Sequence, residues 1–347
     1  MLRGRIKGFA LACVFATFLT ACGVKADKVA EGMQLIEKLD YAGALVQFNE
    51  AEAMKENERL ISRGRGIAYM GLAKYEEAIP CFVQALTSSN GLVENIDYDL
   101  NYYLAAAYAK NNQFAEAEKC YDAILALRAK EKEAYFMRGN VRMALGKYED
   151  AKNDFDRVVS MDEKDYDRMI DIYLSMESYG KGNDGKVYLQ RTIEKADKQM
   201  GAFNKGRIYY YLGEYQSAAM ALEEAKDKGG AESYLYLGKA YEATGDYNYA
   251  SSVYNGYLSK NDKNADIYNQ LGVCEMKKGE YQKALEAFLE GKQIADNTNL
   301  QSISFNEVVA YEYLGEFEKA RMLIENYLRT YPDDENAKRE MEFLKTR

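Results

Sequence analysis

The chain has 347 residues, of which 48% are hydrophobic and 29% charged, and it contains only two prolines. This composition is typical of an ordered, largely helical protein and excludes a disordered one. The net charge of −9, without any run of basic residues, argues against a nucleic-acid partner, because binding to phosphate requires clustered lysine and arginine. Histidine is absent, which removes the most common general base and the most common zinc ligand.

The N-terminus has the features of a secretory signal peptide. Arg3, Arg5 and Lys7 precede an apolar stretch at residues 9–20. At about 1.5 Å per helical residue this stretch is too short to span a bilayer. We therefore interpret it as an export signal.

The apolar stretch ends in Leu-Thr-Ala-Cys-Gly at residues 19–23, which resembles the lipobox of bacterial lipoproteins. The resemblance implies that residues 1–21 are removed as a lipoprotein signal peptide, that Cys22 is acylated, and that residues 22–27 form a tether. It also implies an exported protein, anchored to the outer face of the cell membrane, or to an envelope membrane if the host has two. An ordinary signal peptide with a chance cysteine and a short N-terminal anchor helix stay open as alternatives.

From residue 28 onward one motif recurs: a small or turn residue, a spacer, an aromatic residue, two further residues and an alanine. Steps of 34 residues separate Tyr41 from Tyr75, Phe114 from Tyr148, and Tyr247 from Tyr281. A period of this length predicts a stack of helical hairpins. The aromatic positions are Tyr41, Tyr75, Phe114, Tyr148, Tyr215, Tyr247, Tyr281 and Phe317.

Residue size alternates around each aromatic position. Two antiparallel helices approach closely only where the facing side chains are small, and large side chains then fill the space beside the crossing. Nine residues before the aromatic the sequence has Gly66, Ala105, Gly139, Gly206, Gly238 and Gly272. Seven residues after it stand Phe48, Phe82, Tyr121, Phe155, Leu222, Tyr254, Phe288 and Ile324.

This motif, with the Leu-Gly pairs at 237–238 and 271–272, resembles the tetratricopeptide repeat. The resemblance implies an all-α protein, a right-handed α-solenoid of antiparallel helical hairpins. We expect about nine hairpins over residues 28–332 and a charged capping helix over residues 333–347. Insertions are expected around residues 87–97 and 295–299.

The fifth hairpin, at residues 164–199, is expected to be degenerate. It has the expected length, but Gly180, Gly182 and Gly185 blur its turn, and the alanine of the motif is missing.

In tetratricopeptide proteins the first helix of each hairpin lines a concave groove. The resemblance therefore implies that positions twelve and eight residues before each aromatic face a partner. The first set, unusually apolar for a surface, favours a groove for an extended or helical peptide. Packing of these aromatic side chains against the neighbouring helix is the alternative. The predicted partner-binding residues are Tyr102, Phe136, Asn140, Phe203, Arg207, Lys239, Asn269 and Phe305; Val273 and Val309 also occupy the eight-before position.

The sequence contains no phosphate loop, dinucleotide fingerprint, calcium loop or nucleophile elbow. Cys81 and Cys120 occupy equivalent positions in successive repeats, too far apart for a disulfide, and Cys274 stands alone. We expect these three cysteines to be small buried hydrophobic residues. We accordingly predict no enzymatic activity, no cofactor and no metal site.

The leading functional hypothesis is a membrane-anchored extracytoplasmic scaffold or adaptor that binds a protein or peptide through the concave groove. One alternative is a cell-wall or glycan-binding lipoprotein that uses Tyr210, Tyr211 and Tyr313 as stacking platforms. Another is an accessory protein of envelope assembly or secretion.

Overall fold

The structure, a computed structural model, describes residues 27–89, 91–196, 199–294 and 299–347. Within these ranges it contains nineteen α-helices and no strand, so the predicted all-α fold is confirmed. The predicted signal peptide, the acylation site Cys22 and the tether up to residue 26 lie outside the described residues, as does most of the expected insertion at 295–299.

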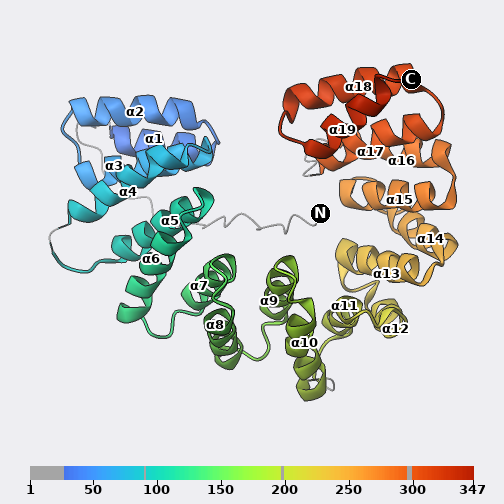
Figure 1. The fold of residues 1–347 in the computed structure, drawn as a ribbon, viewed down its shortest axis with the longest axis horizontal. Coiled ribbons are helices and arrows are strands. Elements are labelled where there is room, and N and C mark those ends of the chain that lie inside the picture. Colours follow the sequence, from blue (N-terminus) through green and yellow to red (C-terminus); the bar gives the residue numbers. More distant parts are fainter. Residues whose placement is uncertain (1–26, 90, 197–198, 295–298) are drawn as a thin grey trace. The chain divides into compact units, whose positions relative to one another are not determined.

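The chain divides into two compact units, one up to Gly185 and one from Lys186 to Arg347 (Figure 1). One helix, α10 (Gly182–Ala196), begins in the first unit and continues into the second. The other helices of the first unit are α1 (Lys28–Glu37), α2 (Tyr41–Ala53), α3 (Glu58–Gly71), α4 (Tyr75–Thr87), α5 (Asn95–Lys110), α6 (Phe114–Leu127), α7 (Lys132–Ala144), α8 (Tyr148–Met161) and α9 (Tyr166–Ser178).

The second unit continues the alternation of paired helices. Its remaining helices are α11 (Ala202–Leu212), α12 (Tyr215–Ala225), α13 (Gly230–Thr244), α14 (Tyr247–Leu258), α15 (Ala265–Lys278), α16 (Tyr281–Lys292), α17 (Leu300–Tyr313), α18 (Phe317–Thr330) and α19 (Glu335–Leu344).

Each odd-numbered helix up to α17 is the first helix of a hairpin, and the following even-numbered helix is the second. Contacts within hairpins are extensive, as between α3 and α4 or α15 and α16, and the second helix of one hairpin also packs on the first helix of the next. The aromatic residue of the motif is the first residue of the second helix, as in Tyr75 of α4 and Tyr281 of α16. The motif therefore marks the turn within each hairpin.

Those turns share one backbone conformation. The residue two positions before each second helix has a left-handed backbone, with φ between 57° and 86°. In the turn between α15 and α16, Gly279 N donates to Met276 O and Glu280 N to Glu275 O, both at 3.0 Å, which ends the first helix. Glycine occupies this position in six hairpins, whereas Leu39, Ala73 and Asn112 occupy it in the first three.

The small residue of the repeat lies against the large residue at each regular helix crossing. A Cβ added to Gly272 would lie 2.3 Å from Cε1 of the fully buried Phe288. A Cβ on Gly238 would lie 2.2 Å from the ring of Tyr254, whose buried hydroxyl donates to Glu242 at 2.6 Å. The spacing of nine and seven residues around the aromatic thus reflects direct contact between the two helices.

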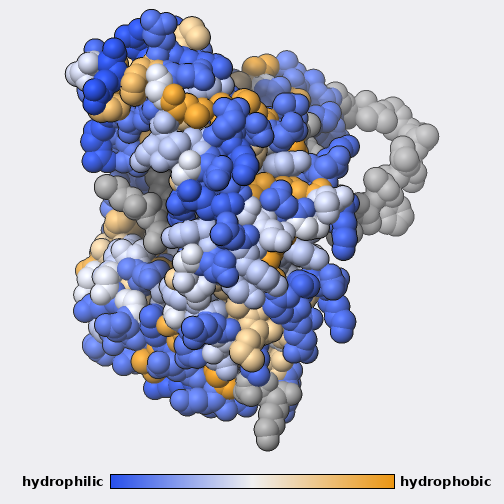
Figure 2. Space-filling view, turned by 90° about the vertical axis from the view of Figure 1, so that its right-hand side faces the viewer, coloured by the Kyte–Doolittle hydropathy of each residue, from blue (hydrophilic) through white to orange (hydrophobic). Residues whose placement is uncertain are grey.

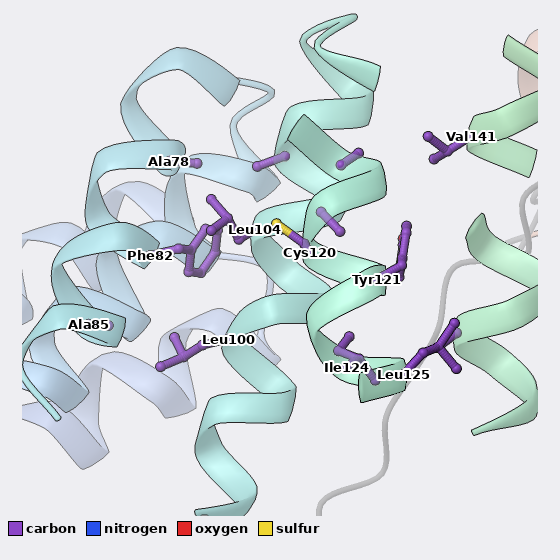
Figure 3. Packing of buried hydrophobic residues seen from close by; sticks show 14 residues of the cluster. Ala78, Phe82, Ala85, Leu100, Leu104, Cys120, Tyr121, Ile124, Leu125 and Val141 are labelled. Atoms are coloured by element: carbon purple, nitrogen blue, oxygen red, sulfur yellow. The ribbon is translucent and has the colours of Figure 1, made fainter. Parts of the chain in front are cut away.

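Large buried side chains join neighbouring hairpins into clusters within each unit. In the first unit, Phe82 of α4, Leu104 of α5 and Ile124 of α6 belong to one cluster of buried residues (Figure 3). In the second unit, Phe288 of α16 and Ile324 of α18 belong to a similar cluster.

The fifth hairpin, α9 and α10, differs from the expectation of a blurred turn. Gly180 has φ of 72° and forms the same turn as the glycines of the other hairpins. The irregularity lies at the crossing, where Tyr173 occupies the position of the small residue and Gly185 that of the alanine. A Cβ on Gly185 would lie 3.2 Å from Tyr173 Cα, so glycine in place of the alanine leaves room for the larger Tyr173, while the fully buried Leu189 keeps the large position.

The last helix, α19, packs on α18 and begins after Pro332. The Asp334 side chain accepts hydrogen bonds from the backbone N–H groups of Asn336 and Ala337, which caps the helix, and Ala337 and Leu344 are buried. Among the described residues no helix is both long and apolar enough to cross a membrane. Hydrophilic residues cover most of the surface seen in Figure 2, and apolar residues form small patches.

Candidate functional site

The first helices of successive hairpins form a layer within each unit. In the first unit α1 contacts α3, α3 contacts α5, and α7 contacts α9; in the second unit α11, α13, α15 and α17 contact one another in succession. We call the surface formed by these first helices the inner face of the unit. The predicted partner-binding residues all lie on these helices.

In the first unit the predicted residues contact the neighbouring helices of the stack. Phe136 of α7 is only 8% exposed, and the guanidinium of Arg168 on α9 lies 4.0 Å from the centre of its ring. Asn140 accepts a hydrogen bond from the Ser175 hydroxyl of α9. Tyr102 of α5 is half-buried, and burial raises the pKa of its phenol.

In the second unit Phe203, Arg207 and Lys239 surround one tyrosine of α13. The ring of Tyr236 lies 6.5 Å from that of Phe203, and its centre lies 5.6 Å from the Arg207 guanidinium and 5.9 Å from the Lys239 ammonium. Cation–π attraction orders such groups when they are partly desolvated. The Tyr236 hydroxyl also forms a 2.8 Å hydrogen bond with the Tyr211 hydroxyl.

Asn269 and Phe305 lie further along the same inner face. The Asn306 amide of α17 donates to Asn269 Oδ1 at 2.9 Å, so the two side chains link α15 to α17. Phe305 packs beside Tyr327 of α18, with 5.9 Å between ring centres. The predicted residues therefore lie between hairpins: Phe136 and Arg207 are buried, and the other six are half-buried.

The second unit also contains a pocket. Only some of the residues that line it are at the predicted partner-facing positions. It has a volume of about 380 Å³ and lies among α15, α16 and α17. Val273 and Val309, both at the eight-before position, line it together with Met276 and Asn306. The signal in the sequence is the short valine at two successive positions where the preceding hairpins have Arg207 and Lys239.

Acidic side chains within the stack have structural partners. Glu242, buried on α13, accepts hydrogen bonds from Tyr254 of α14 at 2.6 Å and from Gln270 and Lys277 of α15 at 2.8 Å. In the first unit Glu118 accepts from Arg142 and Lys147. Burial opposes ionisation of Glu118, but these two hydrogen bonds outweigh it and lower its pKa. These carboxylates connect neighbouring helices.

The thiols of the described residues are poor nucleophiles. Cys120 and Cys274 are buried and Cys81 is half-buried, and none of the three forms a disulfide. Burial raises the pKa of Cys120 to about 11 and that of Cys274 to about 12, which keeps both thiols protonated. Within the described ranges no group of three or more cysteine, aspartate or glutamate side chains could hold a metal ion.

Family models described as tetratricopeptide repeat match residues 132–165 and residues 63–134, 203–265 and 237–297. Together these matches cover more than half of the chain, which therefore belongs to the tetratricopeptide-repeat family. Repeats of this family suggest a protein-interaction scaffold.

Curated relatives match only part of the chain. RNA polymerase II-associated protein 3 from Homo sapiens is 26% identical over 189 residues, which are 47% of this chain and 28% of that protein. The protein of the same name from Xenopus laevis is 23% identical over 208 residues, which are 55% of this chain and 31% of that protein. The chain thus spans less than a third of the length of these relatives.

Two solved structures are similar to the chain at low sequence identity. A tetratricopeptide repeat protein from Parabacteroides merdae has a TM-score of 0.48 and 14% identity, with coverage of 82% of this chain and 97% of that one. MamA from Desulfovibrio magneticus has a TM-score of 0.42 and 16% identity, with coverage of 51% and 99%.

Proposed function

We propose that the chain is an exported scaffold, held by lipid on Cys22 at the outer face of the cell membrane or of an envelope membrane. In this proposal it binds a protein or peptide partner on the inner faces of its units and catalyses no reaction. Envelope assembly or secretion is the kind of process in which such an anchored scaffold serves as an accessory protein.

The inner face of the second unit is the observation that carries the binding role. Four first helices contact one another there in succession, and a pocket opens among α15, α16 and α17. Half-buried Phe203, Lys239, Asn269 and Phe305 offer apolar, cationic and amide groups along the same face. Grooves of this mixed character suit peptide segments, since apolar contacts give affinity and amides satisfy the backbone.

The sequence around Cys22 supports the anchoring role. Two or more acyl chains give durable attachment, at about 0.8 kcal/mol for each methylene group buried in the bilayer. The first described helix begins at Lys28, so the tether is short. At about 3.3–3.6 Å per extended residue, the first hairpin would lie within roughly 20 Å of the bilayer.

A glycan-binding role is a second candidate, and Tyr313 favours it. This side chain is 60% exposed, and its ring lies 4.8 Å from that of Tyr281. Tyr210 and Tyr211 fit less well because both are half-buried, and burial raises the pKa of each phenol. Co-sedimentation with purified cell-wall polysaccharide, abolished by Tyr313→Ala, would favour this role over peptide binding.

Mass spectrometry of the mature protein from its native host tests the anchor. We expect an acylated N-terminal residue at Cys22, and Cys22→Ser should leave an unlipidated chain that no longer fractionates with membranes. A mature N-terminus at any other residue would contradict the lipoprotein assignment.

Site-specific photo-crosslinking in living cells tests the binding role. A photoreactive residue at Asn269 on the inner face should capture a partner, whereas one at Met220 should not. Met220 is 77% exposed on α12, a second helix. Equal capture from both positions would argue against the inner face as the binding surface.

A further inference from the structure

Antiparallel helices place the connections between hairpins on one edge of the first unit and the turns within hairpins on the opposite edge. Glu56, between α2 and α3, accepts hydrogen bonds at 3.0 Å from the backbone N–H groups of Lys28 and Val29 at the start of α1. Arg59, at the start of α3, donates to Glu94 just before α5 at 2.8 Å. The chain therefore enters α1 on the same edge as the connections to α3 and α5, and we call this the connecting edge.

Large apolar side chains are exposed along the connecting edge. The connection after α6 belongs to this edge as well, because Arg128 donates to Asn95 at the start of α5 at 2.9 Å. The exposed large apolar residues described on this edge are Met54, Leu60, Leu92, Val93 and Leu127. Among the described residues of the opposite edge, the same three hairpins expose Leu39 and Leu72. Apolar residues that gather on one edge indicate contact with another apolar surface.

The connection between α4 and α5 extends the connecting edge (Figure 1). It runs over residues 88–94, whereas residues 54–57 and 128–131 connect the neighbouring hairpins, so it forms much of the first insertion expected from the sequence. Leu92 and Val93 are adjacent in it, and Leu92 is 69% exposed. The pair offers two apolar side chains for burial in an apolar phase, which is favourable in proportion to the area removed from water.

Cations that hold the connecting edge together are ion-paired. The Lys28 ammonium lies 2.8 Å from the Glu31 carboxylate, and the Arg59 guanidinium lies 2.8 Å from the Glu94 carboxylate. The chain as a whole carries a net charge of −9. Attraction to anionic lipid headgroups therefore contributes little here, and contact with a membrane would depend on burial of the apolar side chains.

The proposed lipid anchor lies close to the same edge. The six residues from Cys22 to Lys28 span at most roughly 20 Å when extended, at about 3.3–3.6 Å per residue. Lys28 begins α1 on the connecting edge, and the opposite edge lies farther by the length of α1, about 15 Å at 1.5 Å per residue. An acylated Cys22 would therefore bring the connecting edge next to the bilayer.

We propose that the connecting edge of the first unit rests on the bilayer, with Leu92 and Val93 inserted at the boundary between lipid headgroups and fatty acyl chains. The proposal rests on the proposed acylation of Cys22 and specifies which edge of the anchored scaffold contacts the membrane. The inner face of the unit stays available to a protein partner, because it is formed by the sides of the first helices and not by their ends.

Photolabelling from within the bilayer tests the proposal. The mature protein, expressed in its native host, is placed in vesicles of phosphatidylethanolamine and phosphatidylglycerol that contain a phosphatidylcholine with a diazirine in its acyl chain. After irradiation, peptide mass spectrometry locates the lipid adducts and shows in the same spectra whether Cys22 is acylated. Leu92→Asp combined with Val93→Asp removes the apolar pair, and Leu92→Phe retains it. Leu39→Asp is the matched control, because Leu39 is 71% exposed on the opposite edge.

We expect adducts at Leu92 and Val93 and few at Leu39. The double aspartate variant should lower the yield of adducts on the connecting edge at least tenfold, since transfer of one leucine side chain from acyl chains to water changes the equilibrium by about that factor or more. Leu92→Phe and Leu39→Asp should keep the yield within about twofold of the unmodified protein, because neither removes apolar area from the connecting edge.

The contrary outcomes are distinguishable. Adducts that are as frequent at Leu39 as at Leu92, or absent from Leu92 and Val93 while Cys22 is acylated, would refute the contact and leave the anchor standing. An unchanged yield in the double aspartate variant would refute insertion of the pair. Spectra in which Cys22 carries no acyl group would refute the anchor, and the inference would fall with it.

Discussion

Replacement of Gly272 by alanine tests whether close helix crossings determine the stability of the stack. The added Cβ would lie 2.3 Å from Cε1 and 2.6 Å from Cδ1 of Phe288, well inside van der Waals contact. Phe288 is fully buried beside α15, so the added carbon would force its ring out of its present packing, toward the pocket that it also lines. Overpacking of this kind costs about 1–3 kcal/mol.

Gly272→Ala also increases helix propensity, and this gain in stability has to be subtracted from the cost of overpacking. Alanine stabilises a helix interior by about 1 kcal/mol relative to glycine. Gly256 of α14 provides the matched control, because a Cβ there would meet no atom within 4 Å. Gly256→Ala should therefore stabilise the protein by about 0.5–1 kcal/mol, while Gly272→Ala destabilises it by up to about 2 kcal/mol.

Urea unfolding gives these free energies, and hydrogen exchange shows where the structure loosens. Because each hairpin contacts only its neighbours, exchange should accelerate in α15 and α16 before it does so elsewhere. Phe288→Leu should partly relieve Gly272→Ala, with a coupling energy measurable in a double-mutant cycle. If Gly272→Ala proves as stable as Gly256→Ala, the close crossing is not the reason for glycine at this position.

Three further substitutions probe other parts of the structure. Ala73→Gly should stabilise the protein by about 0.5–1 kcal/mol in urea unfolding, because a left-handed backbone is costly for any residue with a Cβ; a loss of stability would contradict the strain argument. Phe136→Ala should lower stability by about 3–5 kcal/mol, and an unchanged melting temperature would show that the ring is not part of the core. Burial and the adjacent Glu340 carboxyl raise the pKa of Glu312 to about 8, above its ordinary value of 4.5. The native state therefore holds the proton more tightly than the unfolded state, so this group's contribution is complete below pH 4.5 and is lost as the pH rises through 8. Relative to Glu312→Gln, the unmodified protein should lose on the order of 1 kcal/mol between pH 5 and pH 9, a value reduced by solvent screening of this half-exposed group; parallel pH profiles of the melting temperature would refute the assignment.

The repeat pattern allowed the fold to be predicted because its spacing is set by direct contacts. Gly238 and Tyr254 stand sixteen residues apart in the sequence since they meet at a helix crossing. The helix crossing of the fifth hairpin was harder to predict, because the motif places the small residue on the first helix. There Tyr173 occupies the position of the small residue and Gly185, in place of the alanine, leaves room for it, which the spacing of the motif does not show.

The exposure of the inner-face residues could not be predicted from their register. Phe136 has the position of a groove residue, yet Arg168 from the next hairpin covers its ring. Coverage depends on the length of a side chain 32 residues away and on the conformation it adopts. Side-chain length also explains the pocket. Val273 and Val309 are too short to fill the space that longer side chains fill beside α11 and α13.

The distribution of turn residues would have a mechanical consequence if the chain is anchored through Cys22, as proposed above. The three hairpins nearest that end turn on Leu39, Ala73 and Asn112, whereas every later hairpin turns on glycine. The left-handed conformation costs about 1–2 kcal/mol at leucine and alanine and less at asparagine. A pulling force transmitted through Cys22 would load these weaker hairpins first, and they would unravel one at a time. The tether would lengthen while the pocket beside α17 kept its shape, so a bound partner would stay held under tension.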